Sequence, residues 1–328
     1  MKFYALLCAV LAICMLILPA LALSTVAEHT SSAVSTAQIS ERNSDPSKIA
    51  IYLKDEGKKI ELDMNEYLVG AVAAEMPAEY HDEALKAQAI ASHTYALYRQ
   101  SREQLSSTPT LSGADLSDDP ELYQGYWDQE TRKNRWGADF ETNEQKIRSV
   151  VSEVQDLILT YDNEPIDAVF FSMSAGRTES AANVFGVDLP YLQSVTSDAD
   201  TLSPVCSKTV YYSDEEFLNR LQKIEMIEPV SKLTDDCIGE RIVRESGTVK
   251  SVTLCGNTVS GQQIREAFGL NSTAFTIEQN DSGFAIRTMG NGHFVGMSQY
   301  GAEQMARDGA TFRQILHHYY TGVTLSDE

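Results

Sequence analysis

The sequence predicts an α+β protein, with helices at the start and end of its main region around antiparallel strands. Three observations predict this class. Residues 48–62 alternate apolar and polar side chains with the period of a strand, and residues 64–102 repeat apolar side chains with the period of a helix. Residues 206–285 then alternate short strand patterns with turns, and two more helical patterns follow them.

The first elements expected are a hairpin and two helices. A turn at residues 55–57 separates the two strands of the hairpin. A helix follows over residues 64–76, with Asn65 as its expected N-cap. Pro77 ends this helix, because the residue before a proline is kept out of the helical region. Small alanine side chains recur through a second helix, expected over residues 82–102, and they let another element approach it closely.

The later elements follow from the same patterns. In chain order we expect a loop over residues 104–140, a short helix over 146–154, two strands around a turn at 162–163, helices near 215–224 and 261–268 within the strand-rich subregion 206–285, and two final helices separated at 308–309.

The first part of the chain predicts a membrane anchor. Residues 3–23 contain no charged side chain, and about 20 apolar residues suffice for a helix to span a bilayer. Lys2 precedes this run and Glu28 follows it, so the main region is expected outside the cytoplasm. The alternative is a cleaved signal peptide. The expected organisation is an anchor over residues 1–23, a flexible linker over 24–47 and the main domain over 48–328.

The overall charge argues against a nucleic-acid partner. The chain has 26 lysine and arginine residues against 47 aspartate and glutamate residues, a formal net charge of −21. A nucleic-acid partner would require a basic surface to neutralise phosphates. A neutral polysaccharide remains compatible with this composition.

Three cysteines lie outside the apolar segment, namely Cys206, Cys237 and Cys255. An odd number allows one disulfide and one free thiol, with three pairings open. Their spacing lacks the short C-x-x-C unit of common zinc sites, so no metal is expected.

Glu75 is the first candidate catalytic residue. It ends the apolar run Leu68–Ala74, where a charge is poorly hydrated. Poor hydration raises the pKa of a carboxyl and lets it deliver a proton near neutral pH. The alternative is a solvated carboxylate at a helix end. Lys86 and His93 are seven residues apart on the second helix, hence on one face, where they could contact a polar ligand or simply be solvated.

Four stretches then identify a family. AAEMP followed by EALKAQAIASHTYA resembles the N-terminal motif of the stage II sporulation protein D family, which is related to an amidase enhancer. The stretches FFSMSAGRTESAANVFGVDLPYLQSV, GTVKSVTLCGNTVSGQQIREAFGLNSTAFTI and GNGHFVGMSQYGAEQMARDGATFRQILHHYYTGV are similar to its later motifs, in the same order. Together these matches cover most of residues 49–323.

The resemblance implies a lytic transglycosylase that cleaves peptidoglycan glycan strands during engulfment in endospore formation. It carries the catalytic glutamate over onto Glu75 and the family's lysine onto Lys86. One carboxyl suffices for this reaction, which forms a 1,6-anhydro sugar and consumes no water. The resemblance implies no cofactor. It also implies a location on the membrane at the sporulation septum, and as partners a peptidoglycan amidase/endopeptidase and a multispanning membrane protein.

Further candidate binding residues follow from the later motifs. His293, Ser298, Gln299 and Tyr300 lie in a glycine-rich turn that leads into a helix, where they would surround the sugar or serve packing and tight turns. Arg177 is a candidate for binding the lactyl carboxylate of muramic acid, or for an internal salt bridge.

The chain departs from the family pattern at several positions. His93 stands where the family commonly has arginine, so activity would depend more on pH if this position orients substrate. Phe294 stands where the family usually has glycine. Some family members carry a His/Cys metal-binding segment, but the matching stretch LSDDPELYQGY has neither residue, which predicts no zinc.

Two other functions share these motifs. The first is a non-catalytic enhancer that binds glycan and activates a separate cell-wall amidase. The second is a simple hydrolase, which would require a second carboxylate near Glu75; Glu79, Asp82 and Asp167 are its candidates.

Overall fold

The computed structural model describes residues 45–327 except residues 46, 226, 229, 231, 232 and 235. They belong to one compact unit, Asp45–Glu328, with the predicted α+β class. The expected anchor over residues 1–23 lies outside the described residues, as does nearly all of the expected linker. No helix within the described part is long and apolar enough to cross a bilayer.

The predicted hairpin is present. β1 (Lys48–Leu53) pairs antiparallel with β2 (Lys58–Asp63), and the short β3 (Leu116–Ser117) adds to β1 in parallel. The side chains of Ile49 and Ile51 point into the core, as the alternating pattern requires.

The helix that carries Glu75 has its N-cap two positions earlier than predicted. α2 spans Met64–Glu75, and its N-cap is Asp63, whose side chain accepts a hydrogen bond from the N–H of Asn65 at 3.0 Å. The expected Asn65 cap is wrong, because Met64 is already helical and Asp63 is the last extended residue. The helix ends with Met76 in the extended region before Pro77, as predicted.

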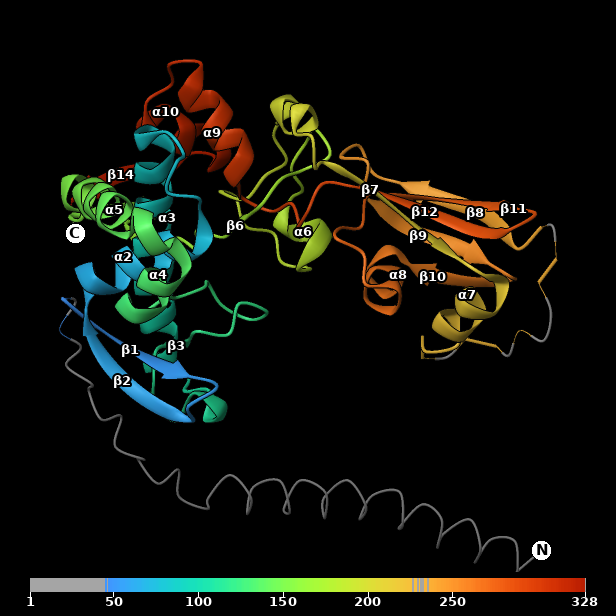
Figure 1. Ribbon diagram of the computed structural model, residues 1–328, viewed down its shortest axis with the longest axis horizontal. Coiled ribbons are helices and arrows are strands. Elements are labelled where there is room, and N and C mark those ends of the chain that lie inside the picture. Colours follow the sequence, from blue (N-terminus) through green and yellow to red (C-terminus); the bar gives the residue numbers. More distant parts are fainter. Residues whose placement is uncertain are drawn as a thin grey trace, which may run out of the picture. The chain divides into compact units, whose positions relative to one another are not determined.

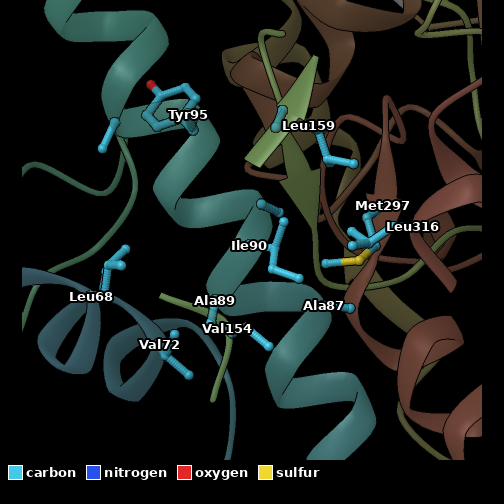
Figure 2. Packing of buried hydrophobic residues seen from close by; sticks show 14 of the residues in the cluster. Leu68, Val72, Ala87, Ala89, Ile90, Tyr95, Val154, Leu159, Met297 and Leu316 are labelled. Carbon is cyan, nitrogen blue, oxygen red and sulfur yellow. The ribbon is translucent and has the colours of Figure 1, made fainter. Parts of the chain in front are cut away.

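α3 (Asp82–Leu105) is the long helix at the centre of the helical part. It packs against α2, α5 (Phe140–Val154), α9 (Gln299–Arg307) and α10 (Phe312–Tyr319). Its buried alanines leave room for these neighbours. Figure 2 shows side chains of α3, including Ile90, between Leu68 and Val72 of α2 on one side and Met297 and Leu316 on the other.

Short strands tie the middle of the chain to its last elements. β4 (Leu157–Tyr161) lies between β5 (Glu164–Pro165) and β14 (Thr324–Asp327), and β6 (Phe170–Phe171) pairs in parallel with β13 (Met297–Ser298). The β6–β13 pairing brings the central motif next to the start of α9.

One helix lies where a loop was expected. α4 (Gln129–Trp136) has no apolar period, so the sequence pattern did not predict it. Tertiary contacts hold it instead: the Arg132 guanidinium is fully buried and forms ion pairs with Glu66 at 2.9 Å and Glu144 at 2.8 Å. The expected short helix is also longer, since α5 starts at Phe140.

The strands between Ser207 and Met289 gather with two helices around a core of their own (Figure 1). They form two antiparallel sheets, in the orders β10-β9-β8 and β11-β12-β7. The elements are β7 (Ser207–Tyr212), α7 (Asp214–Leu221), β8 (Ile238–Val243), β9 (Val249–Leu254), β10 (Asn257–Ser260), α8 (Gly261–Phe268), β11 (Phe275–Asn280) and β12 (Gly283–Met289), and the short α6 (Ala181–Val184) precedes them.

The cysteine pairing left open by the sequence is resolved here. Cys237 and Cys255 form a disulfide, and Cys206 is a buried free thiol. The disulfide joins the residue before β8 to the turn between β9 and β10.

Candidate active site

The carboxylate of Glu75 is held by two hydrogen bonds at the end of α2. Oε1 accepts a hydrogen bond from the backbone N–H of Gly125 at 2.6 Å, and Oε2 accepts one from Nε2 of Gln299 at 3.2 Å. These donors come from the loop before α4 and from the first residue of α9. The side chain therefore has one defined position, set by three distant parts of the chain.

Burial raises the pKa of Glu75, because the surrounding protein hydrates the anion less well than water does. The hydrogen bonds from Gly125 and Gln299 oppose this rise by stabilising the anion. A carboxyl whose anion is disfavoured by burial but held by two donors can give a proton and then take one, which is what a general acid that later acts as a base requires.

Gly125 allows the loop to approach the carboxylate closely. A Cβ atom at this position would lie 3.3 Å from Oε1 of Glu75 and 3.2 Å from Cβ of Ala74. Any side chain would thus crowd the carboxylate away from the backbone donor. Sequence reasoning missed Gly125, because its contribution is a backbone N–H and leaves no side-chain signal.

Glu75 opens onto a cleft of about 920 Å³. Binding sites of this size accommodate several sugar-sized groups. Aromatic and amide side chains share its lining, which suits the apolar faces and polar edges of sugar rings. The lining includes Glu75, Tyr95, Tyr123, Gln124, Phe170, Phe171, Phe185, Arg265, Asn291, His293 and Gln299.

Gln299 is fixed by the start of α9. The hydroxyl of Ser298 caps this helix by accepting a hydrogen bond from the N–H of Gly301, and it donates one to the buried Asp200 at 2.7 Å. Nε2 of Gln299 also lies 3.4 Å from Oε1 of Gln88 in α3. Ser298 thus positions the neighbouring amide that contacts Glu75.

His293 lines the same cleft as a neutral imidazole. Burial, together with the nearby positive charge of Arg265, lowers its pKa to about 4. Nδ1 accepts a hydrogen bond from the N–H of Val295 at 3.0 Å, and the ring lies between Phe171 and Phe185, with centroid distances of 5.7 and 5.5 Å. Such a ring can contact a sugar without carrying charge at neutral pH.

The other predicted binding residues lie elsewhere. Among the residues described, the cleft lining does not include Lys86, His93, Arg177, Ser298 or Tyr300. Their predicted substrate contacts stay predictions.

The contacts of these residues are structural. Lys86 forms ion pairs with Glu83 at 3.1 Å and Glu153 at 2.7 Å, and the side chain of His93 is only 1% exposed within the packing of α3. Arg177 donates from Nε to Ser194 at 3.1 Å. The face that carries Lys86 and His93 therefore serves packing and ion pairing in this structure.

The carboxylates proposed for a hydrolase also lie off the cleft. Glu79 and Asp82 are exposed, and Asp167 is a partly buried carboxyl whose pKa is raised to about 6 by burial. None of the three is among the described lining residues, which instead include the exposed Glu121 and Glu266. In the described part of the chain, no group of three or more His, Cys, Asp or Glu side chains could hold a metal ion.

Comparisons with known proteins cover both the site and most of the chain. The family model described as Stage II sporulation protein matches residues 53–161, which include Glu75. Stage II sporulation protein D of Bacillus subtilis (strain 168) is 37% identical over 283 residues, 86% of this chain and 80% of that protein. The protein of the same name from Bacillus amyloliquefaciens is 38% identical over 283 residues, 86% of this chain and 79% of that protein.

A more distant relative carries a different name. The amidase enhancer of Bacillus subtilis (strain 168) is 25% identical over 315 residues, 79% of this chain and 40% of that protein. The similarity to the two sporulation proteins is both higher and spread over most of each chain. The chain therefore belongs to the stage II sporulation protein D family.

Proposed function

We propose that this sporulation protein is a peptidoglycan lytic transglycosylase with Glu75 as its catalytic acid and base. The observation that carries the proposal is the position of Glu75: a partly buried carboxyl with a raised pKa, held by two donors, on a sugar-sized cleft. The substrate is the glycan strand, cleaved between N-acetylmuramic acid and N-acetylglucosamine.

The reaction requires one carboxyl in two roles. Protonated Glu75 gives its proton to the bridging oxygen, and the bond from that oxygen to the anomeric carbon of the muramic residue breaks. The Glu75 carboxylate then takes the proton of the C6 hydroxyl of the same muramic residue, whose oxygen bonds to the anomeric carbon. The products are a 1,6-anhydro end and a free 4-hydroxyl, and Glu75 returns to its protonated state.

The residues around Glu75 have separate tasks in this proposal. Gly125 and Gln299 stabilise the carboxylate after the first proton transfer. The aromatic side chains of Tyr123 and Phe171 offer flat apolar surfaces to the sugar rings. We place the protein at the membrane of the sporulation septum, anchored by residues 1–23, with an amidase and a multispanning protein as partners.

The proposal is tested by incubating purified glycan strands with the wild-type chain and with Glu75→Gln. The wild type should release fragments with anhydro-muramic ends, and Glu75→Gln should lower the rate by at least about a thousandfold while its thermal unfolding stays cooperative. Glu121→Gln is the matched control, because it removes a carboxylate from the same cleft and should retain cleavage. Turnover by Glu75→Gln contradicts the proposal.

A non-catalytic enhancer is the second candidate, favoured by the 25% identity to the amidase enhancer. In that function the cleft binds glycan without cutting it and recruits an amidase. Binding of glycan strands by the wild type with no new ends formed, together with a faster reaction of added amidase, would support the enhancer over the transglycosylase.

A further inference from the structure

The cleft contains one strongly basic side chain. Among its described lining residues Arg265, in the last turn of α8, is the only lysine or arginine, whereas Glu75, Glu121 and Glu266 are acidic. α8 belongs to the strand-rich subregion, so Arg265 and Glu75 reach the same cleft from different parts of the fold.

Arg265 is partly buried and forms no ion pair with a carboxylate in the described part of the chain. Its Nε donates to the carbonyl oxygen of Leu270 at 3.3 Å, and no ion pair within 4.0 Å joins it to a carboxylate of the described residues. The adjacent Glu266 forms no ion pair with it: Oε1 of Glu266 accepts a hydrogen bond from Gln262 at 2.8 Å, and its charge acts on Arg265 only at longer range. The terminal nitrogens of the guanidinium are thus left to bind a group in the cleft.

Burial lowers the pKa of Arg265, so the protein around it stabilises the cation poorly. The pKa of the neighbouring His293 is lowered chiefly by burial and also by the positive charge of Arg265, so that ring is neutral at neutral pH. An anion that enters the cleft beside Arg265 would therefore meet a poorly hydrated guanidinium whose positive charge only Glu266 partly offsets.

We propose that Arg265 forms the anion subsite of the cleft and binds the lactyl carboxylate of an N-acetylmuramic acid residue. A guanidinium presents paired N–H donors that match the two oxygens of a carboxylate. N-acetylglucosamine carries no charge, so this subsite distinguishes the two alternating sugars and sets which of them lies against α8. The proposal rests on the glycan substrate of the proposed function.

Our proposal places this subsite at Arg265 rather than at Arg177, where the sequence led us to expect it. Arg177 is outside the described cleft lining, donates to Ser194 and lies 3.6 Å from the exposed Glu245. Sequence reasoning missed Arg265, because the pattern over residues 261–268 predicts a helix but not which of its polar side chains reaches the site.

The test measures binding on the Glu75→Gln background, so that no strand is cut. The probes are an N-acetylglucosamine–N-acetylmuramic acid oligomer with free lactyl carboxylates and the same oligomer with these carboxyls converted to neutral methylamides. The parent should bind the charged oligomer about tenfold more tightly. Adding Arg265→Gln should abolish this preference, and Arg265→Lys should restore part of it. Arg287→Gln, at an exposed position of β12, is the matched control and should keep the preference.

Any other outcome would contradict the proposed subsite. Equal binding of the two oligomers by the parent, no binding of either, or an equal loss for both in Arg265→Gln would show that Arg265 does not bind the carboxylate. A different result would contradict the proposed function. If the wild-type chain prefers the charged oligomer but does not cut glycan strands, the subsite is supported and the transglycosylase activity is contradicted.

Discussion

Gln299 donates a hydrogen bond from Nε2 to Oε2 of Glu75 at 3.2 Å, although the two residues are 224 positions apart in the sequence. The contact joins the first motif of the chain to the last one. It also links the protonation of Glu75 to the position of α9, because Gln299 is the first residue of that helix.

Replacing Gln299 by leucine should therefore change the pH dependence of cleavage. Leucine cannot donate, so the Glu75 anion loses one of the two interactions that oppose the rise of its pKa. The acid form then persists to higher pH, and the alkaline fall of kcat should move upward while kcat at its optimum falls by roughly tenfold. Gln304→Leu, on the same helix but outside the described cleft lining, is the control. An unchanged pH profile would show that Gln299 does not act on Glu75.

Glu75→Gln should stabilise the fold at neutral pH. The folded pKa of Glu75 lies above its unfolded value, so its contribution to stability is fully present below the unfolded pKa of about 4.3 and is lost as pH rises through the folded pKa. Glu75→Gln has no carboxyl to ionise, so it does not lose this stability as the pH rises. Urea unfolding at pH 4 and pH 7 should show a gain for Glu75→Gln that is larger at pH 7. The exposed Glu79→Gln controls for the loss of a charge, and a gain that is larger at pH 4 would refute the argument.

Gly125→Ala should impair cleavage without unfolding the protein. The added Cβ would lie 3.3 Å from Oε1 of Glu75, and the neighbouring Ala74 restricts the room for adjustment. Displacement of the carboxylate by even a few tenths of an ångström lengthens its hydrogen bond, and we expect kcat to fall by roughly tenfold to a hundredfold with little change in KM. Steady-state kinetics on glycan strands would measure this effect, with the thermal midpoint of unfolding as a control for folding. Full activity would contradict the prediction, because it would mean that the loop moves to make room for the added Cβ without displacing Glu75.

Replacing Phe294 by glycine should destabilise the fold less than replacing it by alanine. It has a φ of +70°, where an L-residue is strained, yet its ring is fully buried and lies 5.5 Å from that of Phe171. Loss of the ring should cost about 3–5 kcal/mol in Phe294→Ala. Phe294→Gly should be less destabilised by roughly 1 kcal/mol, since glycine relieves the backbone strain. Denaturant unfolding of both variants tests the order, and a less stable glycine variant would reverse it.

The sequence predicted those helices and strands whose own residues show a helical or alternating repeat of apolar side chains. The hairpin, α3, α8 and the last two helices follow from alternation, helical period and turn residues within each segment. α4 could not be predicted in this way, because buried ion pairs of Arg132 with Glu66 and Glu144 hold it, and these partners lie on other helices. The N-cap is Asp63 rather than the expected Asn65. Both residue types cap helices well, so only the position at which the backbone becomes helical distinguishes them.

The same distinction applies to the candidate site, where some residues were predictable from their own sequence context and others were not. Glu75 was predictable because a carboxylate stood at the end of an apolar run, and Gln299 and His293 because they stood in a recognisable motif. Gly125 contributes a backbone N–H, and Arg265 reaches the cleft only through the packing of α8. Lys86 shares the predicted helix with many core residues, but its direction is set by Glu83 and Glu153, one of which lies on α5.

The most direct measurement is cleavage of purified glycan strands in water enriched in oxygen-18, followed by mass spectrometry of the new ends. If Glu75 alone transfers the protons and the C6 hydroxyl of the muramic residue is the nucleophile, the new ends are 1,6-anhydro sugars and contain no heavy oxygen. If a carboxylate such as Glu121 instead directs a water molecule to the anomeric carbon, each new reducing end takes up one heavy oxygen at the moment of cleavage, and the single-carboxyl account is contradicted.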